Sequence, residues 1–148
     1  MDQTSLADLF SLTTEIRRKN ALIMSLKLKK FDITHEQWFV LRTITNTDFS
    51  TQKVIADLTN KGKSTLTRIL DQLEQKNLIE RHVNDEDRRS IVLVETNKGK
   101  TIVQQILPVE EEIRTRIRNG ISEDEIIHLN NMFKKFLDNI EEIIREET

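Results

Sequence analysis

The chain has 148 residues, of which 32% are charged and 36% hydrophobic, with three glycines, one proline and no cysteine. This length suits one compact unit, and the scarcity of helix-breaking residues predicts a mostly helical fold. The absence of cysteine excludes disulfides, thiolate metal sites and redox sensing by thiols. No apolar run approaches the ~20 residues of a membrane span, and the N-terminus carries acids where a signal peptide has basic residues. We therefore expect a soluble cytoplasmic protein.

The net charge of −2 does not by itself indicate nucleic-acid binding, but the charges are unevenly distributed. Residues 1–60 carry 8 basic and 7 acidic side chains, residues 61–100 carry 9 and 7, and residues 101–148 carry 6 and 11. The acidic excess thus lies in the C-terminal third. Mild positive charge in the middle of the chain is compatible with DNA binding, because affinity depends on which side chains reach phosphates.

The first part of the chain predicts three helices. Residues 5–30 contain recurring aliphatic side chains without any breaker, which indicates a long helix with a broad apolar face. Thr34 and Gln37 form a capping-box pattern at the start of a second helix. A polar break then leads to Ser50, which we expect to cap a short third helix.

The next segment predicts a helix followed by a hairpin. Residues 63–76 place four apolar side chains on one helical face. Residues 78–83 alternate apolar and polar side chains, and residues 90–95 are rich in β-preferring side chains. We expect these two segments to pair as antiparallel strands. The tip between them, residues 84–89, sets two arginines beside three acids.

Two long helices are predicted after the hairpin. Thr96 is expected to cap the first, Pro108 to kink it by removing one intrahelical hydrogen bond, and Gly120 to end it. Ser122 and Glu125 form another capping-box pattern. In the last helix, apolar residues recur at 126, 129, 133, 136, 140 and 143, the spacing of a helix-packing seam. Such a helix needs a partner, within the chain or across a dimer.

Residues 55–100 resemble the MarR family of bacterial transcription regulators. The resemblance rests on the ordered run KSTLTRILDQLEQKNLIER, the tip motif Asp87-Arg88-Arg89 and the junction ETNKG before the following helix. The long helices on either side extend it to essentially the whole chain. It implies a homodimer that binds pseudo-palindromic double-stranded DNA, and we expect this homodimer to act as a repressor. Many members of the family release DNA when a small molecule binds between the dimerisation and DNA-reading regions.

The resemblance also implies the fold class and the organisation of the chain. We expect a mainly α protein with a small β-hairpin, a winged helix-turn-helix in which four helices precede the hairpin and two follow it. Residues 1–148 are expected to form a single unit. Within it, residues 34–99 are the expected DNA-binding region, and residues 1–33 and 100–148 are the expected dimerisation region.

Two positions depart from the family pattern. Before the fourth helix, Lys61 and Gly62 stand where an apolar residue and a serine are usual. We expect Lys61 to point outward and Gly62 to act as a weaker N-cap. After the hairpin, Glu95 stands where leucine is usual, so an apolar contact is missing while Thr96 keeps the cap. Both departures concern the geometry of a turn and remove no group that contacts DNA.

The fourth helix is the predicted recognition helix. Ser64 and Arg68 share one face with Thr65 close by, and apolar side chains occupy the opposite face. A helix N-terminus in the major groove would present these side chains to bases or phosphates. The predicted contacts from this helix are Lys63, Ser64, Thr65, Thr67 and Arg68. The alternative interpretation is the solvated face of an ordinary helix.

The hairpin is the predicted wing. A minor groove attracts arginine through its negative potential, and the resemblance implies that Arg89 inserts there while Asp87 holds the loop by hydrogen bonding. The predicted wing contacts are Arg81, His82, Asp87, Arg88 and Arg89. The predicted contacts to the DNA backbone are Ser50, Thr51, Gln52, Lys53 and Lys61. The alternative interpretation of the tip is an ordinary charged hairpin turn.

A small aromatic or amphipathic effector is a further expectation from the resemblance. The candidate pocket is lined by Arg17, Met24, Phe31, Trp38 and Phe39, from the first two helices and their connection. An aromatic wall with one arginine would suit an aromatic acid. The alternative is that these residues belong to the core.

No other chemistry is indicated. The three histidines lack the spacing of a metal site, and no nucleophile motif or glycine-rich phosphate loop occurs. We therefore expect no metal, no cofactor, no membrane association and no enzymatic activity. Two alternative functions stay open. One is a winged-helix adaptor whose wing and helix face bind a protein, which the net charge and the acid-rich tip favour. The other is a DNA-binding member of the family without an effector.

Overall fold

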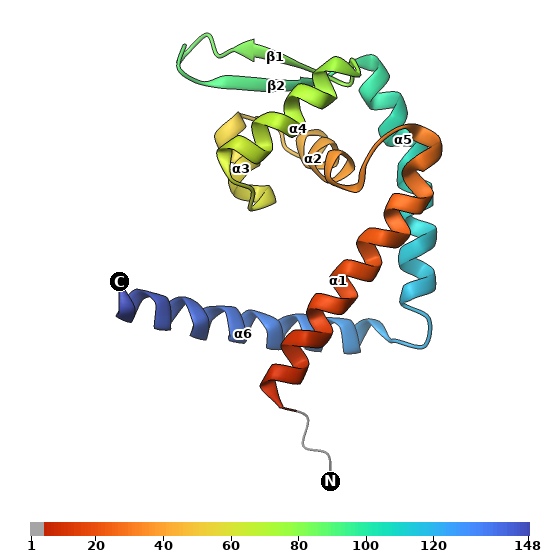
Figure 1. Cartoon of the computed structure of the whole chain (residues 1–148), viewed down its shortest axis with the longest axis vertical. Helices are drawn as coiled ribbons and strands as arrows, with labels where there is room; N and C mark the ends of the chain where they lie inside the picture. Colours follow the sequence, from red (N-terminus) through yellow and green to blue (C-terminus); the bar gives the residue numbers. More distant parts are fainter. Residues whose placement is uncertain (1–4) are drawn as a thin grey trace. The chain divides into compact units, whose positions relative to one another are not determined.

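The computed structural model describes residues 5–148 of the chain, so residues 1–4 of the expected dimerisation region lie outside it. The elements, in chain order, are α1 (Leu6–Leu28), a 3-10 turn η1 (Lys29–Phe31), α2 (His35–Thr45), α3 (Gln52–Thr59), α4 (Lys63–Gln75), β1 (Ile79–Val83), β2 (Ile91–Glu95), α5 (Asn97–Ile117) and α6 (Glu123–Glu147) (Figure 1). The expected fold class, a mainly helical winged helix-turn-helix, is confirmed. Residues 5–110 form one compact unit and residues 111–148 a second.

Side-chain caps begin several helices where the sequence predicts them. The Thr34 hydroxyl accepts from the Gln37 N–H at 3.1 Å at the start of α2, and the Gln37 side chain returns the bond to the Thr34 N–H. The same reciprocal pattern joins Ser122 and Glu125 at the start of α6. A further capping box at Ser5, before α1, was not predicted. Reciprocal capping satisfies two otherwise unpaired N–H groups and so defines each helix start.

The predicted cap of α3 is wrong by one residue. Thr51 caps this helix, because its hydroxyl accepts from the Val54 N–H at 3.2 Å. Ser50 is buried instead, and its hydroxyl donates to the backbone carbonyls of Ile44 and Thr47. The Ser50 carbonyl also accepts from the N–H of Leu93 in β2 at 2.7 Å. Ser50 therefore anchors the entry to α3 against the hairpin.

The core of the first unit lies among the end of α1, α2, α3, α4, α5 and the hairpin (Figure 1). Each of these elements contributes fully buried side chains, among them Leu28, Leu41, Ile55, Leu66, Ile69, Leu70, Leu73, Ile79 and Ile106. The inward face predicted for residues 63–76 is confirmed. Burial of each such side chain contributes about 1.5–3 kcal/mol to folding. The hairpin is antiparallel, and an isolated bridge between Thr51 and Val92 ties it to the start of α3.

The junction between the hairpin and α5 is closely packed against the two residues that precede β1, Asn77 and Leu78. The Thr96 hydroxyl accepts from the Gly99 N–H at 3.0 Å and donates to the Asn77 carbonyl at 2.6 Å, so its predicted capping role is confirmed. Gly99 lies so near Leu78 that a Cβ at this position would overlap the Leu78 carbonyl oxygen. Glu95, which departs from the family's leucine, accepts a hydrogen bond from the Thr45 hydroxyl at 2.7 Å.

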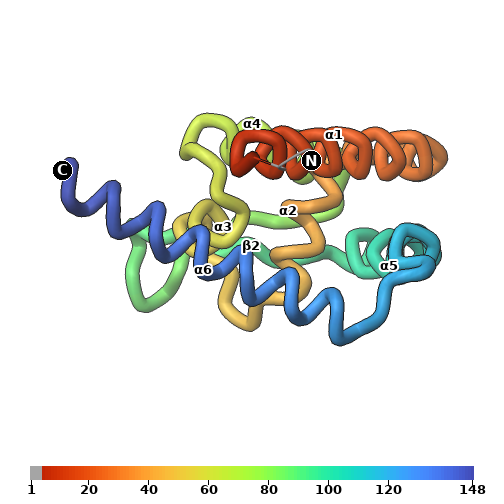
Figure 2. Tube along the Cα trace, turned by 90° about the horizontal axis from the view of Figure 1, so that it is seen from below, coloured from red at the N-terminus to blue at the C-terminus, as the bar shows by residue number. Residues whose placement is uncertain are grey.

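The long helices carry much exposed apolar surface. Figure 2 shows α1 as one long uninterrupted helix, and several of its large apolar side chains are exposed, among them Leu12, Ile16 and Leu26. α5 continues through Pro108, and Gly120 adopts the positive φ of 80° expected after a helix end. α6 has no buried residue within the chain. No helix in residues 5–148 is long and apolar enough to span a membrane.

Candidate nucleic-acid interface

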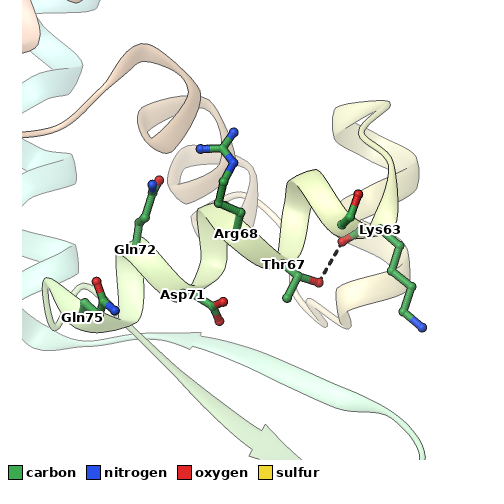
Figure 3. A pocket seen from close by; sticks show the side chains of 7 residues that line it. Lys63, Thr67, Arg68, Asp71, Gln72 and Gln75 are labelled. Atoms are coloured by element: carbon green, nitrogen blue, oxygen red, sulfur yellow. Dashed lines mark hydrogen bonds between the residues drawn. The ribbon is translucent and has the colours of Figure 1, made fainter.

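The outer face of α4 is polar and lines a shallow groove (Figure 3). The groove is lined by Lys63, Ser64, Thr67, Arg68, Asp71, Gln72 and Gln75. Four of the five side chains predicted for the recognition helix are thus gathered there, and the fifth, Thr65, is exposed. Gly62 is the N-cap, and no side chain caps the first turn of α4. Its backbone N–H groups and the helix dipole favour an anion at this end.

Arg68 is held on one flank of α4 by α2. Its Nη2 donates to Glu36 Oε2 at 3.3 Å, and both side chains remain about half exposed, at 53% and 51%. The other oxygen of the same carboxylate lies 3.8 Å from Lys61 Nζ. The expectation that Lys61 points outward is wrong, because its side chain folds back to this acid and is only 18% exposed.

A buried polar contact continues along the same flank. Gln37 is 4% exposed, and its Nε2 donates to Gln72 Oε1 at 3.0 Å. Its own oxygen accepts from Lys76 Nζ at 3.0 Å, and Lys76 also donates to the carbonyl of Asp32. The start of α2 therefore contacts α4 at three successive turns, at residues 68, 72 and 76, as i, i+4 spacing allows.

Arg81 braces the other flank of α4. Its guanidinium lies 2.7 Å from Asp71 and 3.7 Å from Glu74, and it donates to the Thr67 carbonyl at 3.3 Å. The side chain is 19% exposed. Arg81, predicted as a wing contact to DNA, is thus engaged in joining β1 to α4. His82, its neighbour, is exposed beside Glu80 at 2.9 Å.

The tip of the hairpin is held by its own acids. Asp87 Oδ1 accepts from the Arg89 N–H at 3.0 Å, and the Asp87 carbonyl accepts from the Ser90 N–H at 2.9 Å. The Asn84 side chain accepts from the Glu86 N–H at 3.1 Å. Arg88 and Arg89 are exposed. The Asp87 carboxylate therefore stabilises the turn by accepting a hydrogen bond within it, which is the role that the family resemblance implies.

A second groove lies between α3, the start of α4 and the hairpin. Its lining includes Thr51, Gln52, Lys53, Lys63, Asp87 and Arg89. Residues predicted separately from three segments are therefore brought together, with three cations and one acid. Gln52 Nε2 donates to the Thr67 hydroxyl at 3.1 Å and so links α3 to α4. Ser50, predicted as a backbone contact, is absent from this lining because its hydroxyl is buried in the turn.

The residues predicted for an effector pocket are divided between core and surface. Trp38 and Met24 are buried, at 2% and 4% exposure, whereas Phe39 is 40% exposed. Arg17 is exposed on α1, and Phe31 is partly exposed with Lys30 Nζ 5.1 Å from its ring centre. This division favours the alternative that Trp38 and Met24 are core residues.

A buried acid, which the sequence did not indicate, lies next to Trp38. Glu110 of α5 is 8% exposed and accepts from Trp38 Nε1 at 3.1 Å and from Arg42 Nη1 at 2.8 Å. An acid in a glutamate run gives no sign of such a role, and the separations of 72 and 68 residues lie beyond any helical spacing. The Arg42–Glu110 pair fastens α5 to α2.

His35, the first residue of α2, has a shifted pKa. Burial lowers its pKa below the ordinary 6.5, and the positive charge of Lys61 lowers it further, while Glu110 and Glu36 act in the opposite direction. Neutral His35 is therefore the form that the fold favours. No group of three histidines, aspartates or glutamates in residues 5–148 could hold a metal ion.

Comparisons with known proteins agree with this geometry. A family model described as MarR family matches residues 33–91. The solved complex of S. aureus MepR with DNA is 26% identical, with 95% of this chain and 99% of that chain covered and a TM-score of 0.81. A mutant of E. coli MarR complexed with operator DNA is 26% identical, with 90% and 96% covered and a TM-score of 0.81. The transcriptional regulator SlyA shares the fold, at 23% identity, 91% and 95% coverage and a TM-score of 0.82.

The matched region and the structural likeness cover different parts of the chain. The family model covers α2, α3, α4 and β1 and ends at the start of β2, and the likeness to the solved structures extends across the long helices as well. The fold fits this group of proteins, whose members are transcriptional regulators and not enzymes. Residues 33–91 thus match the MarR family, and the chain is similar in fold to solved transcriptional regulators of that family.

Proposed function

We propose that this regulator is a homodimer that binds pseudo-palindromic operator DNA and represses transcription. The observation that carries the proposal is the groove between α3, the start of α4 and the hairpin, where Lys53, Lys63 and Arg89 meet. Three cations from three segments form a surface that suits a phosphate backbone. The solved complexes of MepR and of a MarR mutant with DNA support the same assignment.

In this proposal α4 enters the major groove and the hairpin lies along the minor groove. Ser64, Thr65 and Arg68 supply contacts to bases or nearby phosphates, because they lie on the exposed face near the start of α4. Arg89 enters the minor groove, which attracts arginine through its negative potential. Arg81 acts indirectly, by keeping the hairpin in place beside α4 through Asp71.

Dimerisation is the second part of the proposal. α1 and α6 each expose many large apolar side chains, and α6 buries none within the chain. A second copy is the partner that the family resemblance implies for these helices. A two-fold dimer would place two copies of α4 about one DNA turn, ~34 Å, apart, which matches a pseudo-palindromic site.

The third part of the proposal is that a small aromatic or amphipathic effector releases the protein from DNA. We place the protein in the cytoplasm. Since Trp38 and Met24 are core residues, we place any such molecule near the exposed members of the predicted set, Arg17, Phe31 and Phe39. Stabilisation by ligand raises the unfolding temperature in proportion to the logarithm of its concentration over its Kd. A thermal-shift series with small aromatic acids tests this part, and no shift with any of them argues for a regulator without an effector.

A protein adaptor is the second candidate function. The observation in its favour is the acid content of the hairpin tip, where Asp85 and Glu86 are exposed beside the arginines, in a chain of net charge −2. Such a surface would bind DNA weakly and a basic protein partner better. The two candidates differ in salt dependence, because phosphate contacts release counterions and contacts to a protein do so far less.

The decisive experiment is binding to a fluorescent random-sequence duplex at low and physiological salt, with the mass in solution measured alongside. Affinity that falls steeply with salt in a dimer supports the regulator of DNA. Arg89→Ala is expected to weaken binding to all sequences by about tenfold and to reduce the salt slope by about one. The matched control is Arg145→Ala, which removes the same charge from α6. Equal binding by wild type and Arg89→Ala contradicts the wing assignment, and a dimer without affinity for DNA favours the adaptor.

A further inference from the structure

Glu36 is an acid placed among the cations of the proposed DNA surface. One of its carboxylate oxygens lies 3.3 Å from Arg68 Nη2 in the second turn of α4, and the other lies 3.8 Å from Lys61 Nζ in the turn before α4. Phosphate would meet the same two cations. A carboxylate at this position therefore weakens binding to DNA of any sequence. Its role must be something other than the attraction of phosphate.

The position of Glu36 is defined by its neighbours. It follows the Thr34 cap by two residues and precedes Gln37, which is 4% exposed and bonded to Gln72 and to Lys76. Figure 3 shows Arg68 and Gln72 projecting from the same side of α4. Because the adjacent residue is locked to α4, the carboxylate of Glu36 stays within reach of Arg68.

The contact contributes little to folding. Both side chains are about half exposed, and exposed ion pairs typically contribute ~0–1 kcal/mol. Its effect on recognition is larger, because a guanidinium has five N–H donors in one plane. Glu36 takes one of them at Nη2 and so orients the plane, leaving the remaining donors for the paired acceptors of a base edge, such as guanine O6 and N7.

We propose that Glu36 is a specificity-determining residue that orients Arg68 toward a base edge and opposes its use on phosphate. At the wrong sequence Arg68 finds only phosphates, which its carboxylate partner repels. At the right sequence the base edge satisfies the donors that Glu36 leaves available. This inference rests on the proposed DNA binding and goes beyond it by assigning discrimination to an acid on α2.

The test compares Glu36→Gln with Glu15→Gln. Glu15 is also ion-paired, at 2.8 Å to Lys19, and its side chain is 50% exposed, so the control removes the same charge from a similar pair on α1. The Kd values for an operator selected by the wild type and for a random duplex are measured at one salt concentration, and the mass confirms the same assembly for each variant. Glu36→Gln is expected to bind the random duplex about three- to tenfold more tightly and to lower the operator-to-random ratio by about tenfold. Glu15→Gln is expected to change neither.

A double variant separates orientation of Arg68 from a general change of charge. Arg68→Ala should lower the ratio by itself, and adding Glu36→Gln to Arg68→Ala should lower it no further, because the group that Glu36 orients is gone. Additive losses overturn the inference, as does an unchanged ratio in Glu36→Gln or an equal change in Glu15→Gln. Wild-type protein without salt-dependent affinity for DNA overturns the proposed function and this inference together, whereas an unchanged ratio in a protein that binds DNA overturns the inference alone.

Discussion

The winged-helix core and α6 have similarly regular apolar patterns but opposite burial. Leu66, Leu70 and Leu73 of α4 are 0% exposed, whereas Ile126, Ile140 and Ile143 of α6 are 39%, 40% and 57% exposed. Both helices place apolar residues three or four apart, which predicts one apolar face in each. The apolar face of α4 is covered by elements of its own unit, and no residue of α6 is buried. Periodicity therefore predicts that a face will be buried, without saying by what.

The strongest test of this contrast is a charge placed on the apolar face of α6. In the proposed dimer, Ile140→Asp appears twice across the interface, and burying an unpaired carboxylate at each copy should cost about 4 kcal/mol in total, or roughly a thousandfold in dimer affinity. The measurement is mass in solution over a range of concentrations. The matched control is Asn139→Asp, which adds the same charge one residue away, outside the apolar spacing.

The outcome distinguishes a buried face from an exposed one. Dissociation by Ile140→Asp but not by Asn139→Asp supports a partner copy on this face. If both variants keep the wild-type mass, α6 does not form the dimer interface, and the contrast between the two regions needs another explanation.

The second prediction tests the close contact between Gly99 and the backbone of Leu78 in the winged-helix unit. A methyl group at Gly99 would overlap the Leu78 carbonyl oxygen, and backbone atoms cannot move aside cheaply. Gly99→Ala is therefore expected to lower the free energy of unfolding by about 2–4 kcal/mol. The comparison is Gly62→Ala, since no atom lies within 4 Å of a Cβ at that position and its φ is −63°. We expect less than about 1 kcal/mol there, because the only losses are those of an N-cap.

Urea unfolding followed by circular dichroism measures both glycine variants. A Gly99→Ala protein as stable as Gly62→Ala would mean that the junction between the hairpin and α5 is more tolerant than its geometry indicates. The contrast with α6 would then be weaker, since the core would no longer be the tightly packed region.

The sequence predicted the helices and the hairpin of this fold. Local patterns carried those predictions: the capping boxes at Thr34 and Ser122, and the strand alternation at residues 79–83, depend on near neighbours alone. The predicted cap at Ser50 failed because serine and threonine can both cap a helix, and the contact of Ser50 with β2 leaves Thr51 as the cap.

The parts of the site that escaped prediction are the long-range polar contacts. Glu36 with Arg68, Arg81 with Asp71, and Glu110 with Trp38 join residues from different elements, at separations of 32, 10 and 72 positions. A charged residue on a helix surface looks the same in sequence whether it meets water, DNA or another side chain. For this reason the sequence could propose Arg81 as a contact to DNA, and only the fold shows that α4 already holds it.

The smallest expected effect is a change of stability with pH, which should occur at a different pH in each of the two regions. Folding lowers the pKa of His35 below 6.5, chiefly by burial, so the unfolded chain binds the proton more readily. Stability from this group is fully present above about 6.5 and is lost as pH falls through that value towards the lower folded pKa. At the start of α6, hydrogen bonds from Ser122 lower the pKa of Glu125, so its contribution is present above 4.5 and is lost as pH falls further.

Unfolding curves between pH 7.5 and about 5 isolate the His35 contribution, because the Glu125 contribution changes only at lower pH. The wild type should lose stability on acidification near pH 6, and His35→Gln should lose less over the same interval, since glutamine takes up no proton. NMR titration of the His35 ring gives the folded pKa directly. A value at or above 6.5 contradicts the prediction, and it would mean that Glu36 and Glu110 outweigh burial and Lys61 at the start of α2.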